Sequence, residues 1–301
     1  MRTVFGAALV AAALFCAPAL ATPPPVVVSL KPLHSLVAMV LDGVTVPALL
    51  LPGATSPHTY TLRPSDARLL SGAGLVIWGG PQLEAFLEKP ISAVAGKARV
   101  LNLLSDPRLT LLPVREAGVA EHEEHHHDGI DPHFWLDPAN AGRVLRTVAE
   151  VLAEIDPANA GRYWANAETN AAALLALDRE LALTLEPVRE EPFLALHDAL
   201  QYLEVRYRLH SAGTLTLSAE RVPGARTMIA VRERIVDAKV RCIVGEQHFP
   251  PALARTMTEG TDARLIVVDT LGVAVPEGPD AYPAMLRRLV ADLRACLSKG
   301  A

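Results

Sequence analysis

Short apolar segments alternate with longer amphipathic segments along most of the chain. The apolar segments are rich in Val, Leu and Ile and are bounded by Pro or Gly, a pattern typical of buried parallel strands. Strands are predicted at residues 26–30, 46–51, 75–78, 100–103, 193–196, 242–245 and 265–268. Helices are predicted between them at residues 32–41, 65–71, 81–88, 197–208, 224–238, 250–258 and 282–298. Strands that alternate with helices in this way indicate βαβ units and parallel sheets.

The longest helical pattern divides these strands into two groups. It covers residues 140–155 and 157–185, with Asp156 placed as a helix N-cap before a proline. We therefore predict an α/β fold of two Rossmann-like lobes with parallel sheets, joined by a long rigid helix. The predicted boundaries are 22–156 for the N-terminal lobe, 157–186 for the linking helix and 187–301 for the C-terminal lobe.

The first 21 residues have the features of a secretory signal peptide. Arg2 supplies a positive charge, residues 6–15 are apolar, and Ala-Leu-Ala at 19–21 predicts cleavage after Ala21. The apolar run is too short to span a bilayer comfortably. The residues before Cys16 also lack the small side chain that precedes a lipidated cysteine. We therefore expect an exported, soluble chain in the periplasm.

The net charge bears on the kind of partner, and the cysteine content bears on the disulfides that the chain can form. The net charge of −5 gives no basic surface for nucleic acid, so a nucleic-acid partner is not expected. Export places the chain in an oxidising compartment. Removal of Cys16 with the signal peptide leaves one possible intramolecular disulfide, between Cys242 and Cys296. The alternative is that both cysteines are free, buried thiols.

Three histidines, His58, His133 and His197, stand in polar, turn-prone breaks of the pattern. His197 directly follows a predicted strand, and Glu246 and Asp269 follow two others, at the edge where ligands of open α/β sheets bind. Three neutral imidazoles and one oxygen suit tetrahedral Zn2+, whereas Mn2+ prefers more oxygen ligands. Because the histidines are distant in sequence, they can meet only in a cleft between lobes. Taken singly, each could instead be a hydrogen-bonded loop or core residue.

An acidic, histidine-containing segment interrupts the apolar pattern at residues 115–131. It includes E-H-E-E-H-H-H-D at 121–128 and predicts a surface loop over 118–129, within the N-terminal lobe. One interpretation is a solvated charged segment. The other is an auxiliary, weak zinc site, weak because a flexible loop loses entropy on chelation. Its candidate ligands are His122, His125, His126 and His127.

Four segments resemble the metal-binding components of zinc and manganese ABC importers. They are L-P-G-A-T-S-P-H-T-Y-T-L-R-P-S-D at 51–66, D-P-H-F-W-L-D-P-A-N-A at 131–141, L-H-D-A at 196–199 and V-D-T-L-G at 268–272. The acidic loop and the two late cysteines resemble the zinc branch in particular. The resemblance implies that zinc is held by His58, His133 and His197, since the manganese branch typically has a carboxylate at the position of His197. It also implies an ABC permease in the membrane as partner, and we expect the binding protein to be a monomer.

Two positions depart from the zinc branch. Its members often carry Glu immediately before the first ligand histidine, whereas Pro57 here cannot ligate through its side chain. The fourth ligand is therefore predicted to be Asp269 or water. Relatives read E-P-Q-F where this chain has Glu246-Gln247-His248-Phe249, and we expect His248 to be exposed rather than ligating.

The predicted function is the high-affinity zinc-binding component of an ABC importer, which captures periplasmic zinc and delivers it to the permease without catalysis. A secreted zinc-dependent hydrolase is the alternative, with a water in an open coordination position and Glu246 as the base. The chain lacks the H-E-x-x-H motif of many such enzymes. A metal-binding adhesin or sensor is a further alternative that the sequence does not separate from transport.

Overall fold

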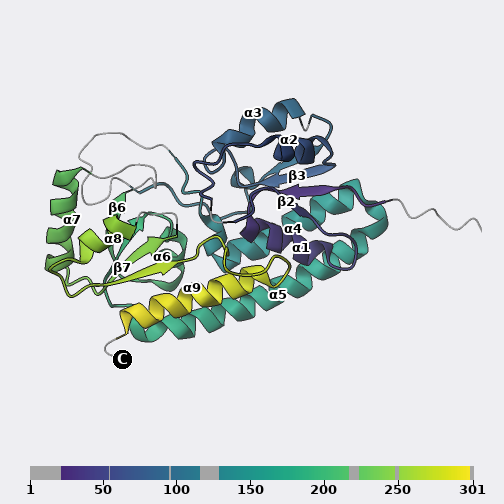
Figure 1. Cartoon of the computed structure of the whole chain (residues 1–301). Coiled ribbons are helices and arrows are strands. Elements are labelled where there is room, and N and C mark those ends of the chain that lie inside the picture. The colour runs from purple at the N-terminus through teal and green to yellow at the C-terminus, as the bar shows by residue number, and fades with distance from the viewer. Residues whose placement is uncertain are drawn as a thin grey trace, which may run out of the picture.

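Two four-stranded parallel sheets form the frame of the molecule, which confirms the predicted α/β fold with two parallel sheets (Figure 1). The computed structural model describes residues 22–53, 55–94, 96–115, 129–216, 224–247 and 251–298. The signal peptide, the loop histidines (His122, His125, His126 and His127) and His248 lie outside these ranges, so the expectations for them stay predictions. Among the helices in these ranges, none is both long and apolar enough to cross a membrane.

Both sheets have the same strand order. It is β2-β1-β3-β4 in the first sheet and β6-β5-β7-β8 in the second, with neighbouring strands parallel throughout. In such a sheet, the switch point lies between the first and third strands, and ligands bind beyond the carboxyl ends there. The strands are β1 (Val26–Val28), β2 (Ala48–Leu49), β3 (Leu75–Trp78), β4 (Arg99–Asn102), β5 (Phe193–His197), β6 (Ser211–Thr216), β7 (Cys242–Glu246) and β8 (Arg264–Val268).

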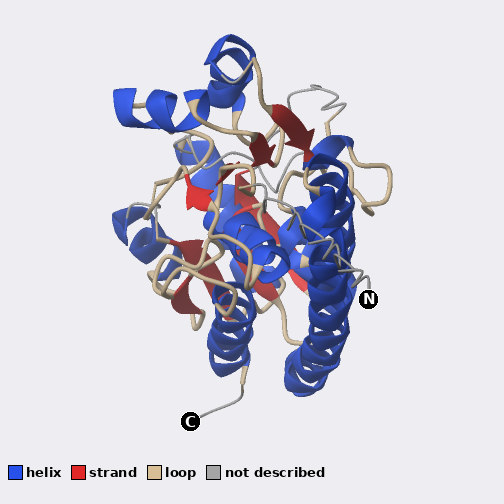
Figure 2. Cartoon of the chain, turned by 90° about the vertical axis from the view of Figure 1, so that its right-hand side faces the viewer, coloured by secondary structure: helices blue, strands red, loops and turns tan. Residues whose placement is uncertain are grey.

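Helices connect the strands and pack against the sheets (Figure 2). We call the first sheet with its helices the first lobe and the second sheet with its helices the second lobe. The α-helices are α1 (Lys31–Leu41), α2 (Pro64–Ser71), α3 (Ala85–Val94), α4 (Pro138–Ile155), α5 (Ala160–Leu185), α6 (Gln201–Tyr207), α7 (Ala225–Asp237), α8 (Pro251–Thr258) and α9 (Ala281–Leu297).

The long helix α5 connects the two lobes. It packs against α1, α4 and α9, and Figure 1 shows it running along one side of the molecule from the first sheet to the second. Its buried side chains recur every three or four residues, so one face is continuously covered. They are Tyr163, Ala167, Ala171, Leu174, Leu177, Asp178, Leu181 and Leu185. The predicted long linking helix is thus confirmed, while the boundaries at 156 and 187 stay predictions.

Strand β6 is absent from the sequence-based prediction. Its sequence, S-A-G-T-L-T, contains small and polar residues rather than an apolar run, because among the described strands it is an edge strand that pairs with β5 alone. Gly213 within it has a φ of +121°, a conformation that favours glycine. Such a strand carries little hydrophobic signal.

Two helix starts were predicted wrongly. Helix α3 begins at Ala85 rather than at residue 81, because the Glu84 carboxylate accepts a hydrogen bond from the Gly80 N–H (3.1 Å) in the preceding turn. His197 is the last residue of β5 rather than the first of a helix, and α6 begins at Gln201. Asp156 lies at the predicted N-cap position, but its carboxylate accepts from other side chains instead of capping.

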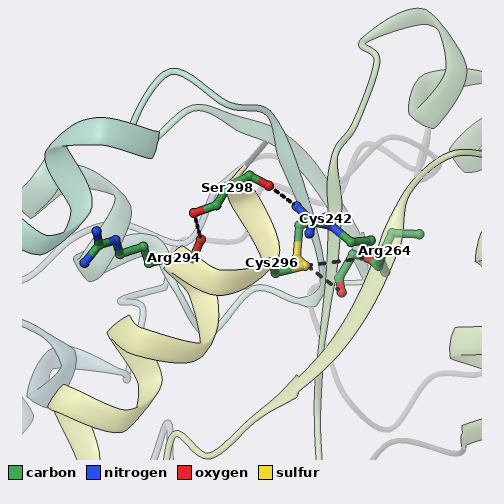
Figure 3. Close-up of a disulfide and its surroundings, with 6 residues drawn as sticks. Cys242, Arg264, Arg294, Cys296 and Ser298 are labelled. Carbon is green, nitrogen blue, oxygen red and sulfur yellow. Dashed lines mark hydrogen bonds between the residues drawn. A yellow bond between two sulfur atoms is a disulfide. The ribbon is translucent and has the colours of Figure 1, made fainter. Parts of the chain in front are cut away.

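A disulfide joins Cys242, the first residue of β7, to Cys296 in the last turn of α9, which confirms the predicted bridge (Figure 3). The end of α9 is also held by Arg264 of β8, which donates to the Ser298 carbonyl, as Figure 3 shows. The closing helix is therefore tied covalently and by hydrogen bonds to the second sheet.

Replacement of both cysteines by alanine is expected to lower the free energy of unfolding by about 4 kcal/mol, because the bridge closes a long loop in the unfolded chain. Denaturant unfolding of the oxidised parent and of the double variant measures the difference. Reduction of the parent should produce a similar loss. Two alkylatable thiols in the oxidised, folded protein would contradict the bridge.

Candidate metal centre

Three histidine rings from distant parts of the chain converge at one point. Ligand atoms of His58, His133 and His197 all lie within 4.8 Å of one another. The ring centroids are 5.7 Å apart for His58 and His133, 5.8 Å for His58 and His197, and 5.0 Å for His133 and His197. Within the described ranges, no other group of three or more His, Cys, Asp or Glu side chains approaches closely enough to hold a metal ion.

The three rings come from both lobes. His58 lies in a turn between β2 and α2, where its N–H donates to the Ser56 hydroxyl (3.3 Å). His133 immediately precedes a 3₁₀ helix, η2 (Phe134–Leu136), that leads into α4. His197 ends β5, at the switch point of the second sheet. The histidine group therefore lies between the lobes.

Buried carboxylates orient two of the rings. Asp131 Oδ1 accepts from both the N–H (2.9 Å) and Nδ1 (2.8 Å) of His133, and Glu246 Oε2 accepts from Nδ1 of His197 (2.8 Å). A carboxylate at Nδ1 favours the tautomer whose lone pair is on Nε2, which is the arrangement common among metal-binding histidines. The other oxygen of Glu246 accepts the Thr270 hydroxyl, so this carboxylate is itself held in place.

The electrostatic environment favours a cation. His133 and His197 are both buried. Burial by itself lowers the pKa of His133, but the attraction and hydrogen bond of Asp131 outweigh it, and Glu246 and Asp198 add to the attraction. The net result is a raised pKa. The same negative charges that stabilise a proton on the imidazole will stabilise a metal ion beside it.

Apolar and backbone groups complete a small cavity around the rings. Its lining includes Pro57, Trp135 and Leu271 besides the histidines. The Trp135 ring contacts the edge of His133 at 5.4 Å between centroids, and its Nε1–H donates to the Thr270 carbonyl (2.9 Å). This hydrogen bond joins η2 to the segment after β8, so the cavity wall is built from both lobes.

Asp269 is not part of the histidine group. Its carboxylate accepts three backbone hydrogen bonds, from the N–H groups of Leu271 (3.2 Å), Val273 (3.0 Å) and Ala274 (2.9 Å). The position after a strand end was predicted, but the turn that follows β8 uses both carboxylate oxygens. The placement of Asp269 therefore does not support it as the fourth ligand, and water is the other candidate predicted from the sequence.

Two residues that orient the site had only weak signals in the sequence. Asp131 stands two residues before His133 in D-P-H, a spacing that lets its side chain reach both the N–H and the ring. Glu246 was expected at the sheet edge, but as a candidate base rather than as the hydrogen-bond partner of His197.

Comparisons of the sequence with known proteins show the family, and a solved structure shows the fold. The family model described as "Zinc-uptake complex component A periplasmic" matches residues 26–296. The chain is 39% identical over 306 residues to the high-affinity zinc uptake system protein ZnuA of Brucella suis biovar 1 (strain 1330), covering 91% of this chain and 92% of that protein. It is 32% identical over 289 residues to the protein of that name from Yersinia pestis, covering 90% and 91%. A solved structure described as the crystal structure of ZnuA shares the fold, with a TM-score of 0.78 at 21% identity, covering 91% of this chain and 99% of that one.

Proposed function

The chain belongs to the family of periplasmic zinc-uptake complex A components, and on this premise we propose that it captures zinc in the periplasm and delivers it to the permease of an ABC importer. The observation that carries the proposal is the convergence of His58, His133 and His197 between two lobes. The ion is cargo, so the site has to hold it and release it. We assign no catalytic role to any residue.

In the proposed site, the three imidazoles are protein ligands and water is the fourth. The set of nitrogen ligands matches the preference of Zn2+ for tetrahedral coordination. Asp131 and Glu246 orient two of the imidazoles and compensate the charge of the ion. Asp269 holds the turn behind the site through its backbone hydrogen bonds.

Zinc is favoured over manganese by the chemistry of this ligand set. Divalent ions bind nitrogen ligands more tightly along the series from Mn2+ to Cu2+, and Zn2+ lies well above Mn2+. A calorimetric competition with Zn2+, Co2+ and Mn2+ on the mature apo-protein tests the assignment. We expect one tight zinc per chain and much weaker manganese. Manganese binding as tight as zinc would contradict it.

The hydrolase alternative has less support from the site. A general base has to reach the metal-bound water, whereas Glu246 is already bonded to His197 Nδ1 and to the Thr270 hydroxyl. Its geometry is that of a residue that orients a ligand. Incubation of the zinc-loaded protein with generic peptide and ester substrates should show no turnover.

Export, lobe boundaries and oligomeric state complete the proposal. We propose cleavage after Ala21, lobes at 22–156 and 187–301 with a linking helix at 157–186, and a monomer in solution. Mass spectrometry of the secreted protein and sedimentation analysis test the cleavage site and the monomer.

Asp131→Asn and Glu246→Gln are each expected to raise the dissociation constant for zinc by about 10–100-fold, the usual cost of changing an outer-shell partner of a metal ligand. Each variant keeps the shape of the side chain but removes its negative charge. The matched control is Glu168→Gln, which neutralises an exposed carboxylate paired with Arg146. Parental zinc affinity in both site variants would show that these carboxylates do not support the ligands.

A further inference from the structure

A short antiparallel stem, residues 111–115 and 129–131, leads directly to the metal site. Its two segments are joined by hydrogen bonds from Val114 N–H to the Gly129 carbonyl and from Asp131 N–H to the Leu112 carbonyl, both 2.9 Å. The stem ends at Asp131, the residue that orients His133. Just before it, the backbone of Thr110 is fixed to α4 by two hydrogen bonds with Asn140, each 2.9 Å. The stem is therefore an extension of the first lobe.

The stem also contacts helix α6 of the second lobe. The Tyr202 hydroxyl accepts from the Leu112 N–H (3.0 Å) and donates to the Asp131 carbonyl (2.8 Å), so it bridges both segments of the stem. Gln201 Nε2 donates to the Pro113 carbonyl (3.2 Å). Tyr202 is almost fully buried, at 2% exposure. These contacts fix the distance between α6 and the residue that holds His133.

Arg115 forms an ion-pair contact between the stem and the second lobe. Its guanidinium binds both carboxylate oxygens of Asp198, with Nε 3.0 Å from Oδ2, and also donates to Glu204 Oε2 at 2.5 Å. The two carboxylate side chains are only 7% and 6% exposed. Asp198 directly follows His197 in the chain. One cation therefore compensates two buried carboxylates of the second lobe, beside a proposed metal ligand.

We propose that Arg115 and Tyr202 act as an interlobe clamp that sets the lifetime of the metal complex; this inference rests on the proposed zinc binding. The stem positions His133 through Asp131. It also contacts Asp198, the residue next to His197 in the chain. Parting of the lobes at this point breaks the bidentate ion pair and both Tyr202 hydrogen bonds. Without Arg115, the two carboxylates gain hydration when the lobes part, so the open form is favoured. Arg115 and Tyr202 are positioning residues, since neither is a proposed ligand and each acts through residues beside the histidines, Asp198 and Asp131.

The clamp has a kinetic signature. Ion release requires the imidazoles of the two lobes to separate, so weakening the clamp should act on dissociation more than on association. We expect Arg115→Gln and Tyr202→Phe each to raise the zinc dissociation rate about tenfold or more, since loss of one partner of a buried, hydrogen-bonded pair acts mainly on dissociation. The association rate should stay within about threefold of the parent. Arg115→Lys, which keeps the charge but loses the bidentate geometry, should lie between parent and Arg115→Gln.

Stopped-flow measurements on the mature protein, with zinc as the probe and a chelator to drive release, give both rates. The matched control is Arg287→Gln, which breaks an exposed bidentate pair with Glu180 between α9 and α5 and should leave both rates unchanged. Tyr202→Phe keeps the buried ring, so it tests the clamp even if Arg115→Gln fails to fold. Release at the parental rate from a folded Tyr202→Phe, or a loss confined to association, would overturn the clamp while leaving the proposed function intact. Failure of the parent to bind zinc would overturn the proposed function itself.

Discussion

Replacement of His58, His133 or His197 by alanine is expected to raise the dissociation constant for zinc by at least about 100-fold, more than the usual effect of an outer-shell change. Each substitution removes one of the three proposed nitrogen ligands, and the lost bond would be replaced by water. The effect should be similar in kind for all three, although His58 and His133 come from the first lobe and His197 from the second. Competition against a chelator of known affinity measures it.

His210→Ala is the matched control for these variants. His210 is an exposed histidine that contacts the Glu190 carbonyl (3.1 Å), and its removal should leave zinc affinity unchanged. Thermal unfolding of the apo-proteins separates loss of a ligand from loss of the fold. If the three site variants bind zinc as the parent does, the histidine group is not the binding site.

Zinc affinity is expected to fall by at least about 100-fold between pH 7 and pH 5, because ligating imidazoles must be neutral and an unperturbed histidine titrates near pH 6.5. The pKa of His133 is raised by Asp131 against the opposing effect of burial. In the apo-protein, His133 therefore takes up a proton at a higher pH than a free imidazole does. As the pH falls, this proton begins to compete with zinc at that higher pH. As far as His133 is concerned, the affinity for zinc has its full value above this raised pKa and decreases below it.

The slope of this pH dependence counts the competing protons. The three rings lie 5.0–5.8 Å apart, so protonation of one disfavours protonation of the next, and the protons are taken up over a broad range. We expect the slope of log affinity against pH to exceed one and to approach three only at the acid end. A slope of one or less throughout would mean that most of the three histidines are not ligands. Asp131→Asn should shift the onset of the decrease to lower pH, because it removes the main cause of the raised pKa of His133.

Hydrophobic periodicity predicted most of the fold because parallel strands are buried on both faces. Three interior strands, β3, β5 and β7, are buried along their whole length and mostly apolar, and their sequence predicted each of them to within one residue. The edge strand β6 was missed because an edge position tolerates polar and small residues. The end of helix α3 was predicted at residue 88, whereas the helix continues to Val94, because Pro90, normally a helix breaker, lies inside it. The errors thus fall at edges and turns, where burial no longer dictates the sequence.

Part of the candidate site could be predicted from the rule that side chains at the carboxyl ends of parallel strands face the ligand-binding edge of the sheet. His197 was identified by this rule and joins two distant imidazoles. The same rule made Asp269 a candidate ligand, but a strand end does not show which backbone groups the following turn must satisfy. Here the N–H groups of that turn donate to the Asp269 carboxylate. The contact of Arg115 with Asp198 and Glu204 links residues more than 80 positions apart. No local pattern predicts such a pair, because only the packed lobes bring it together.

X-ray absorption spectroscopy of the protein loaded with one equivalent of zinc tests the central claim most directly. We expect three imidazole nitrogens and one oxygen at about 2.0–2.1 Å, with no sulfur ligand. His133→Ala should reduce the imidazole contribution to two. A parent spectrum with fewer than three imidazole nitrogens, or one dominated by carboxylate oxygens, would contradict the interlobe three-histidine site.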